Sequence, residues 1–364
     1  MEAIPVLRFA GSHREVGRAI GAATAPVLRA ATAFEAERPA GRSRDEQLAL
    51  ADRYRTATLA TTPWLVEEID GAAEGADVDP RALFAASIEE IWSVRPSQAT
   101  GGTEVLGRCS DVVVGPPATA DGHVWVAHNN DLGAASVEQV VAIEWRVPGE
   151  PVVFSLGIGP WISVGWNDGG LSLTGNELSP NDEKVGVPRL LMVREQLTAR
   201  TLAEATTMAL RPDRASSYNT VFAHRDGGVV DVEGSATDAE LNGLDGGGRL
   251  VHTNHYVCER MLRFEGDPAY ARQSAVRYRR ATELLERGGS VDASRLRAIL
   301  ADHDTSPSIC RHPGATPDDD TATAFWCIAD VTAGEIRFGR ANPCLPGEQR
   351  YAFEPAGVAA SAGA

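Results

Sequence analysis

The 364-residue sequence is short of basic residues and has no long apolar run. It contains 34 lysines and arginines against 50 aspartates and glutamates, which leaves a formal net charge of −16. Proteins that bind a nucleic-acid backbone or an anionic membrane surface need a basic footprint, so the acid excess argues against both partners. No window approaches the roughly 18 consecutive apolar residues of a membrane-spanning helix. We therefore expect neither a nucleic acid nor a membrane as partner.

Cysteines are also few, and they do not form the pattern of a disulfide framework. The five are Cys109, Cys258, Cys310, Cys327 and Cys344. Their number is odd and their spacing is wide. The start of the sequence, MEAIPVLRFAGSHRE, also lacks the charged, apolar and small-residue regions of a secretory signal. These features predict a cytoplasmic protein with reduced thiols. At least one thiol is then a candidate for chemistry rather than for structure.

The first hundred residues have the pattern of helices. Capping boxes at Ser12–Glu15 and Ser43–Glu46 predict two helix starts, because each serine can cap the backbone N–H of the glutamate three residues on. Pro63 and Pro80 each follow a polar residue and fit the first position of two further helices. No strand is expected in this part of the chain.

From residue 109 onward the pattern becomes rich in strands. Two-residue turn signals such as Asp168-Gly169 and Asp226-Gly227 separate runs of β-branched residues and predict hairpins. The expected strands are 109–114, 123–127, 140–147, 152–158, 161–166, 171–174, 219–224, 229–233, 250–254, 324–329 and 335–338. Residues 188–197, 201–210, 271–286 and 293–301 are expected to be helices, and residues 239–249 a loop. This order favours an α+β fold with antiparallel sheets covered by helices over a doubly wound parallel sheet.

Polar side chains stand at the ends of several expected strands. No glycine-rich phosphate loop and no Gly-x-Ser-x-Gly nucleophile elbow is present. Cys109 begins the first expected strand, while Asn129-Asn130-Asp131, Asn176 and Asn254 follow others. Amides and a carboxylate gathered in this way can hold an oxyanion and orient a nucleophile. The alternative is that these residues simply terminate strands, as Asn and Asp often do.

The order of these motifs resembles that of the acyl-coenzyme A:6-aminopenicillanic acid acyltransferase family. This family, also described as isopenicillin N acyltransferase-like, is a branch of the cysteine N-terminal-nucleophile (Ntn) hydrolases. Its relatives include choloylglycine hydrolases, acylethanolamine amidases and β-alanyl amine hydrolases. The resembling motifs are Gly11–Gly17 with Gly21, Arg108-Cys109-Ser110, Asn129-Asn130-Asp131, Gly165–Gly170 with Asn176, Ser217-Tyr218-Asn219, Val232-Glu233, Thr253-Asn254-His255-Tyr256, Ser274–Arg277, and Phe338-Gly339-Arg340 before Pro343-Cys344.

The resemblance implies a four-layer αββα sandwich that cuts its own chain between Arg108 and Cys109. The Cys109 thiol would attack the Arg108 carbonyl, and water would hydrolyse the resulting thioester. Residues 1–108 and 109–364 would then become two associated chains of one Ntn-hydrolase domain. The new α-amine of Cys109 has an ordinary pKa of roughly 7.7–8.0, so it can act as the base for the thiol without a separate histidine.

The resemblance also implies roles for four further residues. Asp131 matches the family's catalytic carboxylate and would orient the α-amine. Asn254 matches the amide that donates to the oxyanion, an interaction typically worth about 10²–10³ in rate. Asn176 resembles a second polar residue of the choloylglycine relatives, and Arg277 resembles an arginine that they keep near the nucleophile. Residue 108 departs from the pattern, because the penicillin enzyme is cut after glycine.

The expected substrate is a small non-protein amide, with no cofactor and no resident metal, and several alternatives stay open. Acyl-coenzyme A is a candidate co-substrate, although the net acidity disfavours a polyanionic one. A β-alanyl or acyl amine hydrolase would need no coenzyme A, and a catalytically silent relative would act as a binding protein. A metal enzyme could use His252 and His255, for which packing roles are favoured since no third ligand is recognisable. The four cysteines other than Cys109 are interpreted as small buried hydrophobes.

Overall fold

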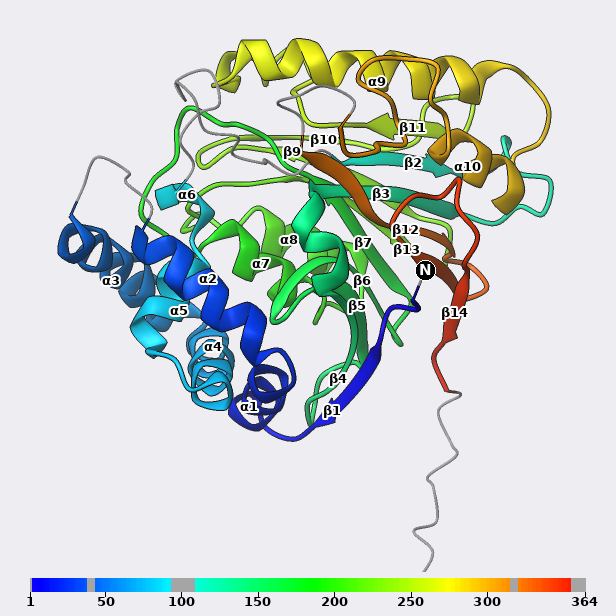
Figure 1. Ribbon diagram of the computed structural model, residues 1–364. Coiled ribbons are helices and arrows are strands. Elements are labelled where there is room, and N and C mark those ends of the chain that lie inside the picture. The colour runs from blue at the N-terminus through cyan, green and yellow to red at the C-terminus, as the bar shows by residue number, and fades with distance from the viewer. Residues whose placement is uncertain (1, 38–42, 93–108, 315–319, 355–364) are drawn as a thin grey trace, which may run out of the picture.

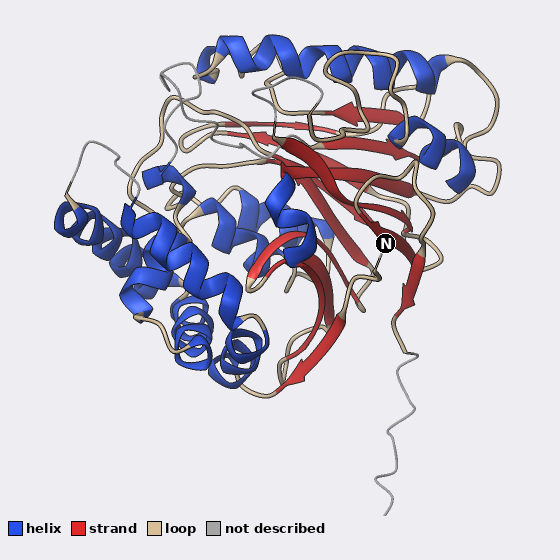
Figure 2. Cartoon of the chain, viewed as in Figure 1, coloured by secondary structure: helices blue, strands red, loops and turns tan. Residues whose placement is uncertain are grey.

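The computed structural model describes residues 2–37, 43–92, 109–314 and 320–354, and it consists of two β-sheets with helices on both sides (Figures 1 and 2). The helices are α1 (His13–Ala23), α2 (Ala25–Glu37), α3 (Arg44–Thr61), α4 (Pro63–Ala76), α5 (Pro80–Ala86), α6 (Glu89–Trp92), α7 (Arg189–Gln196), α8 (Leu202–Ala209), α9 (Pro268–Glu286) and α10 (Ala293–Leu300). None of the helices in these ranges is long and apolar enough to span a membrane.

The larger sheet has eight strands and the smaller has six. In spatial order the larger contains β1 (Val6–Ala10), β4 (Val140–Arg146), β5 (Val153–Ile158), β6 (Trp161–Asn167), β7 (Leu171–Asn176), β8 (Asn219–His224), β9 (Val229–Gly234) and β10 (Ala239–Asn242). The smaller contains β11 (Arg249–His252), β2 (Ser110–Val114), β3 (Trp125–Gly133), β12 (Thr321–Asp330), β13 (Glu335–Arg340) and β14 (Gln349–Ala352). Every pairing is antiparallel except that of β1 with β4, which is parallel.

Three apolar clusters define four layers. Residues from both sheets, including Phe154 of the larger and Phe338 of the smaller, form one buried cluster between them. A second cluster joins the outer face of the smaller sheet to α9 and α10. A third joins the outer face of the larger sheet to α1, α7 and α8. Figure 1 shows the same order of layers, and the predicted αββα sandwich is therefore confirmed.

The N-terminal helices are held by an unusually close crossing of α1 and α4. A Cβ atom on Gly21 would lie 2.0 Å from the backbone oxygen of Ala72, and one on Gly75 would lie 2.0 Å from that of Arg18. Glycine is therefore required at both positions, because any side chain would force the two backbones apart. The predicted starts of these helices are confirmed: Ser12 and Ser43 form complete capping boxes, and Pro63 and Pro80 occupy first-turn positions.

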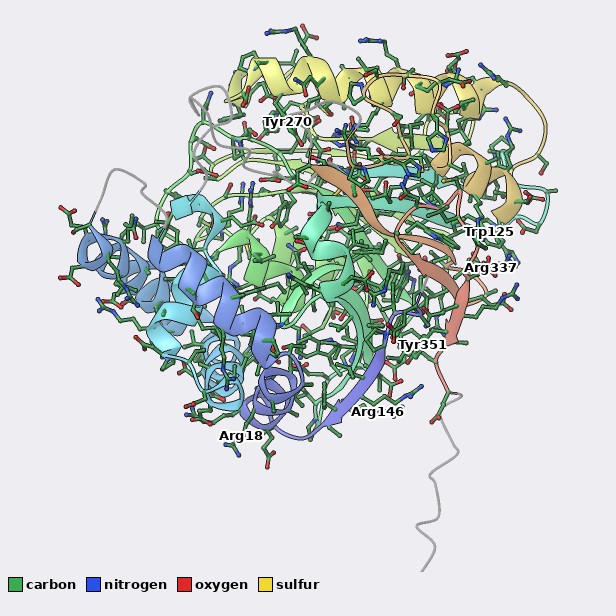
Figure 3. All side chains as sticks on the ribbon, in the orientation of Figure 1. Arg18, Trp125, Arg146, Tyr270, Arg337 and Tyr351 are labelled. Carbon is green, nitrogen blue, oxygen red and sulfur yellow. The ribbon has the colours of Figure 1, made fainter. Side chains whose placement is uncertain are left out.

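Three strands were not predicted. β1 lies in the segment expected to be purely helical, β10 lies in the expected loop 239–249, and β14 follows the last expected hairpin. All three are edge strands of their sheets, and each is paired on one side only. An edge strand is less buried than a central one, so its sequence carries a weaker apolar pattern. β14 is fixed from outside its own sheet: Tyr351 stacks on Phe154, and its hydroxyl donates to Glu144 at 2.7 Å. Figure 3 labels Tyr351 and Arg146, which lie near each other at the lower right of the view.

β3 is longer than predicted, since it continues through Asn129-Asn130-Asp131 to Gly133. These residues are therefore within a central strand and not at its end. Ser110 of β2 pairs with Asn129, and Thr323 of β12 pairs with Asp131. The candidate site consequently lies in the middle of the smaller sheet, where the backbone on both sides is fixed by hydrogen bonds.

Candidate active site

Cys109 directly precedes β2 and is 5% exposed. On the adjacent strand β3, the Asn130 side-chain amide lies 3.5 Å from Cys109 Sγ and can donate to it. The predicted nucleophile is thus a buried thiol, supported by a buried amide, at the start of a central strand. Arg108 and the bond between Arg108 and Cys109 lie outside the described residues.

A buried histidine beside Cys109 was missed by the sequence analysis. His128 of β3 shares a hydrogen bond with Asp111 of β2 at 2.9 Å between Nδ1 and Oδ1, and both side chains are fully buried. Burial disfavours the charged imidazole, but the Asp111 carboxylate outweighs this effect and raises the pKa of His128 to about 10. A hydrogen bond with Cys109 acts in the same direction. The sequence signal was a His-x-Asn-Asp run opposite a Cys-x-Asp run, which only the strand register brings together.

Arg277 connects three parts of the site. This residue of α9 is 1% exposed, so its side chain is buried and not on the outer surface of the helix. Its guanidinium donates to the Cys109 carbonyl at 2.6 Å and to Ser110 Oγ at 2.8 Å. The other terminal nitrogen donates to Asn254 Oδ1 at 2.7 Å. A rigid, permanently charged fork in this position fixes the main chain of the nucleophile and the side chain of Asn254 together.

Asn254 follows β11 and is almost fully buried. Its backbone N–H donates to Ser274 Oγ at 2.7 Å, and its side-chain amide donates to the carbonyl of Glu177 at 3.1 Å. With its oxygen accepting from Arg277, the amide group has one defined orientation. The NH₂ end therefore points away from Arg277 and toward the residue that follows β7.

Asp131 is fully buried in β3. Its Oδ1 accepts a hydrogen bond from Thr323 at 2.7 Å, while its Oδ2 has no hydrogen-bond partner among the described residues. Burial raises the pKa of Asp131 to about 6, in spite of the opposing effect of the Arg277 charge. Because side chains alternate along a strand, Asp131 lies on the face of β3 opposite to His128 and Asn130.

Asn176 is the last residue of β7 in the larger sheet and is fully buried. It pairs with Asn219 of β8, whose amide lies 3.5 Å from Asn176 Oδ1. The next residue, Glu177, supplies the carbonyl that Asn254 contacts. The structure thus connects four of the predicted residues, Cys109, Asp131, Asn254 and Arg277, by hydrogen bonds or direct charge interaction, and it places Asn176 one residue from this network.

The two histidines of the metal-enzyme alternative have other partners. His252 lies 3.0 Å from Glu233 and 2.6 Å from the Thr253 carbonyl, and His255 lies 2.9 Å from Ser274 Oγ. Burial lowers the pKa of His255 to about 4, so this ring is neutral at pH 7. In the parts of the chain that the structure covers, the groups of ligating side chains close enough to hold a metal do not include either histidine.

The interpretation of the remaining cysteines as small buried hydrophobes holds for Cys327 and is wrong for Cys344. Cys327 is fully buried in β12. Cys344 is exposed, because it lies in the connection between β13 and β14, and Cys258 is half-buried. Cys310 is buried, but it lies beside Cys344 rather than among apolar side chains alone.

Several solved structures resemble this chain at low sequence identity. A Caenorhabditis elegans N-acylethanolamine-hydrolyzing acid amidase ortholog is 16% identical, with a TM-score of 0.42, covering 62% of this chain and 93% of that chain. A conjugated bile acid hydrolase from Clostridium perfringens is 13% identical, with a TM-score of 0.46, covering 68% and 97%. Penicillin V acylase from Agrobacterium tumefaciens is 12% identical, with a TM-score of 0.41, covering 67% and 86%.

A family model matches most of the strand-rich part of the chain. Residues 118–342 match the family model described as acyl-coenzyme A:6-aminopenicillanic acid acyl-transferase. This range includes β3, β7, β11 and α9, which carry most of the site, and it spans more than half of the chain. The protein therefore belongs to the acyl-coenzyme A:6-aminopenicillanic acid acyl-transferase family, a group of Ntn-hydrolase amidases and acyltransferases.

Proposed function

We propose that this protein is a self-processing cysteine amidase or acyltransferase that acts on a small amide through a Cys109 thioester. The observation that carries the proposal is the network around Cys109, in which Arg277 holds its carbonyl and Asn130 its sulfur. A thiol whose backbone and side chain are both held by buried donors is positioned before any substrate binds. Family membership supports the same class of reaction.

The first reaction would be the cut itself. Cys109 Sγ attacks the Arg108 carbonyl carbon, the peptide nitrogen of Cys109 leaves with a proton, and water then hydrolyses the thioester. Cys109 has no free amine in the uncut chain, so the proton that the thiol loses is the one that the leaving peptide nitrogen gains. The protonated His128, paired with Asp111, would stabilise the Cys109 thiolate during this transfer, since a positive imidazole stabilises negative charge on a neighbouring sulfur.

After the cut the free α-amine of Cys109 would become the base for each turnover. Asp131 supports this role through its buried Oδ2, which lacks a donor in the uncut chain among the described residues. A carboxylate in this position stabilises the protonated amine. Asn254 would donate to the oxyanion of the tetrahedral intermediate once substrate replaces the Glu177 contact, and Asn176 would border the acyl group from the larger sheet.

The decisive experiment follows the cut and the activity in the same samples. Intact-mass and N-terminal sequencing of purified wild type should show two chains, 1–108 and 109–364. Cys109→Ala should stay as one chain and be inactive, while Cys258→Ala, which changes a half-buried thiol elsewhere, should process normally. An uncut wild type without amidase activity, or a Cys109→Ala protein that keeps wild-type turnover, would overturn the proposal.

A panel of substrates distinguishes hydrolysis, in which water accepts the acyl group, from transfer to an amine. The names of the relatives suggest N-acylethanolamine, a conjugated bile acid and penicillin V as test amides, to which a β-alanyl amine is added. Each should be assayed with water alone and with an acyl-coenzyme A donor plus an amine acceptor. We favour hydrolysis, because the net charge of −16 opposes binding of a polyanion. A catalytically silent protein would cleave none of them and would not be labelled at Cys109 by an electrophilic thiol probe.

A further inference from the structure

A second cluster of reactive side chains lies away from Cys109, in two connecting loops. His303, Cys310 and His312 come from the connection between α10 and β12, and Cys344 comes from the connection between β13 and β14. One ligating atom of each residue lies within 4.8 Å of the corresponding atom of every other. We call these four residues the Cys2His2 cluster.

Four distances between ligating atoms of the Cys2His2 cluster are close to the edges of a tetrahedron. The two sulfur atoms are 3.7 Å apart, and the Nε2 atoms of His303 and His312 are 3.0 Å apart. His312 Nε2 lies 3.8 Å from Cys310 Sγ and 3.4 Å from Cys344 Sγ. Zinc bonds of about 2.3 Å to sulfur and 2.0–2.1 Å to nitrogen give tetrahedral edges of about 3.8, 3.3 and 3.6 Å for S–S, N–N and S–N pairs.

A disulfide bond or direct hydrogen bonds between these side chains explain the arrangement less well than a bound cation does. A sulfur separation of 3.7 Å is far longer than a disulfide bond of about 2.05 Å. The Nε2 atoms of the two imidazoles face each other, and that of His312 also lies near both sulfurs, although a neutral ring can donate from only one nitrogen. A cation at the centre satisfies all four lone pairs at once.

The surroundings of Cys310 also suit a bound metal. Asn342 donates from its side-chain amide to Cys310 Sγ at 3.3 Å, and the same amide donates to the Arg311 carbonyl. Hydrogen bonds of this kind orient and stabilise thiolate ligands. The other three ligands are exposed, so a metal can enter from solvent.

We propose that the Cys2His2 cluster binds one zinc ion as a structural site. Two thiolates and two imidazoles in tetrahedral positions are the donors that zinc prefers, and four protein ligands leave no open position for a catalytic water. The site would hold the 301–314 loop against the 341–348 loop, since it draws three ligands from one and the fourth from the other.

The zinc site would also support the active site without taking part in the reaction. Arg311 lies between the ligands Cys310 and His312 in the sequence, and its backbone N–H donates to Thr323 Oγ1 at 3.0 Å. Thr323 in turn donates to Asp131. The positive charge of Arg311 also acts on Asp131 and favours its ionised form. Fixing this loop therefore fixes one of the groups that surround the buried carboxylate.

The test is metal analysis of the full-length protein purified without chelators and without a polyhistidine tag. We expect about one zinc per chain in wild type. Cys344→Ser, a change at an exposed position, should lower zinc affinity by at least about tenfold. Cys258→Ser, the matched control at a thiol outside the cluster, should keep full zinc content. Cobalt loaded in place of zinc should show tetrahedral d–d bands and thiolate charge-transfer absorption, and the charge-transfer absorption should weaken in Cys344→Ser, which keeps only one of the two thiolates.

Two results would overturn the zinc site. One is wild type that stays free of zinc after dialysis against a zinc buffer. The other is a Cys310–Cys344 disulfide in peptide maps of the unreduced wild type. Neither result depends on the cut at Cys109 or on amidase activity, so the zinc proposal and the proposed function fail separately. A chelator should also lower the melting temperature of wild type and leave that of Cys344→Ser unchanged.

Discussion

Asp131 and His128 lie three residues apart on opposite faces of β3, and their electrostatic environments differ. Asp131 has positive groups nearby and yet keeps a raised pKa, because burial penalises its charged form more than these groups reward it. His128 is equally buried and keeps its proton, because Asp111 contacts it directly. One face of the strand thus carries a carboxyl with a pKa near neutrality, and the other carries a histidine that stays charged. Acid–base chemistry needs two groups whose pKa values differ in this way.

The first prediction concerns the acid limb of activity. If ionised Asp131 orients the α-amine, kcat/KM of wild type should fall as the pH drops through about 6, where this carboxyl takes up a proton. Asp131→Asn should be slower by at least about 10²-fold and should lose the dependence in this range. Steady-state rates across the pH range check both expectations. A wild-type profile that is flat through this range would contradict the assigned role.

The second prediction concerns His128 in the uncut chain. His128→Gln and Asp111→Asn should each slow self-cleavage by about 10–10³-fold, since each removes the positive charge held beside Cys109. The measurement is the rate of fragment appearance after rapid purification, followed at several pH values.

A matched control is provided by His123, which also shares a hydrogen bond with a carboxylate, Asp330, at 2.9 Å. His123→Gln should cleave at the wild-type rate. Equal slowing of the two histidine variants would assign to His128 a merely structural role.

At the scale of secondary-structure elements, the sequence predicted those segments whose signals are local. Both capping boxes and both first-turn prolines were recognised, because they act within one helical turn. The strand β1 was missed, since VLRFA is short and gains its stability from parallel pairing with β4, more than a hundred residues away. β3 was predicted too short, because its polar second half is accommodated by neighbours on both sides rather than by apolar alternation.

The third prediction concerns the crossing of α1 and α4. Replacing glycine by alanine inside a helix ordinarily favours folding by up to about 1 kcal/mol. Gly21→Ala should do the reverse and lower the free energy of unfolding by about 1–3 kcal/mol, because the new Cβ meets the Ala72 backbone oxygen. Urea unfolding of the uncut Cys109→Ala protein measures this without interference from processing.

Gly246→Ala is the control for this series. Gly246 lies in a loop, and a Cβ there would have no neighbour within 4 Å. Its substitution should change the free energy of unfolding little. A Gly21→Ala protein as stable as this control would show that the helices separate at no cost.

At the scale of the whole molecule, the segment before Cys109 is joined to the rest by polar as well as apolar contacts. His13 and Glu68 come from α1 and α4, and they form a cluster with Glu150 and Arg194 from beyond the proposed cut. Trp161 also donates to Ser87 at 2.9 Å, and Tyr218 donates to Glu89 at 2.6 Å. These contacts lead us to expect that chains 1–108 and 109–364 stay associated after cleavage.

The fourth prediction is a pH dependence of this association. Burial disfavours the charged ring of His13, but hydrogen bonds to Glu150 and Glu68 raise its pKa to about 9. A histidine with a raised folded-state pKa contributes stability fully below its unfolded pKa of about 6.5, and this contribution is lost as the pH rises through about 9. The melting temperature of wild type should therefore fall more steeply than that of His13→Gln over this interval. Parallel curves for the two proteins would contradict the expectation.

The sequence by itself determined the class of the protein and the identity of its candidate nucleophile. Helix caps and turn residues act within a few residues, and they predicted antiparallel sheets covered by helices. The family resemblance carried by the order of short motifs implied the four αββα layers and the roles of Cys109, Asp131, Asn254, Asn176 and Arg277. Only the tertiary structure decided which side chains meet. Strand register set His128 and Asp111 beside Cys109, and loops from distant segments brought His303, Cys310, His312 and Cys344 within reach of one ion. Such contacts arise from pairing and packing across long sequence separations, which no local pattern records.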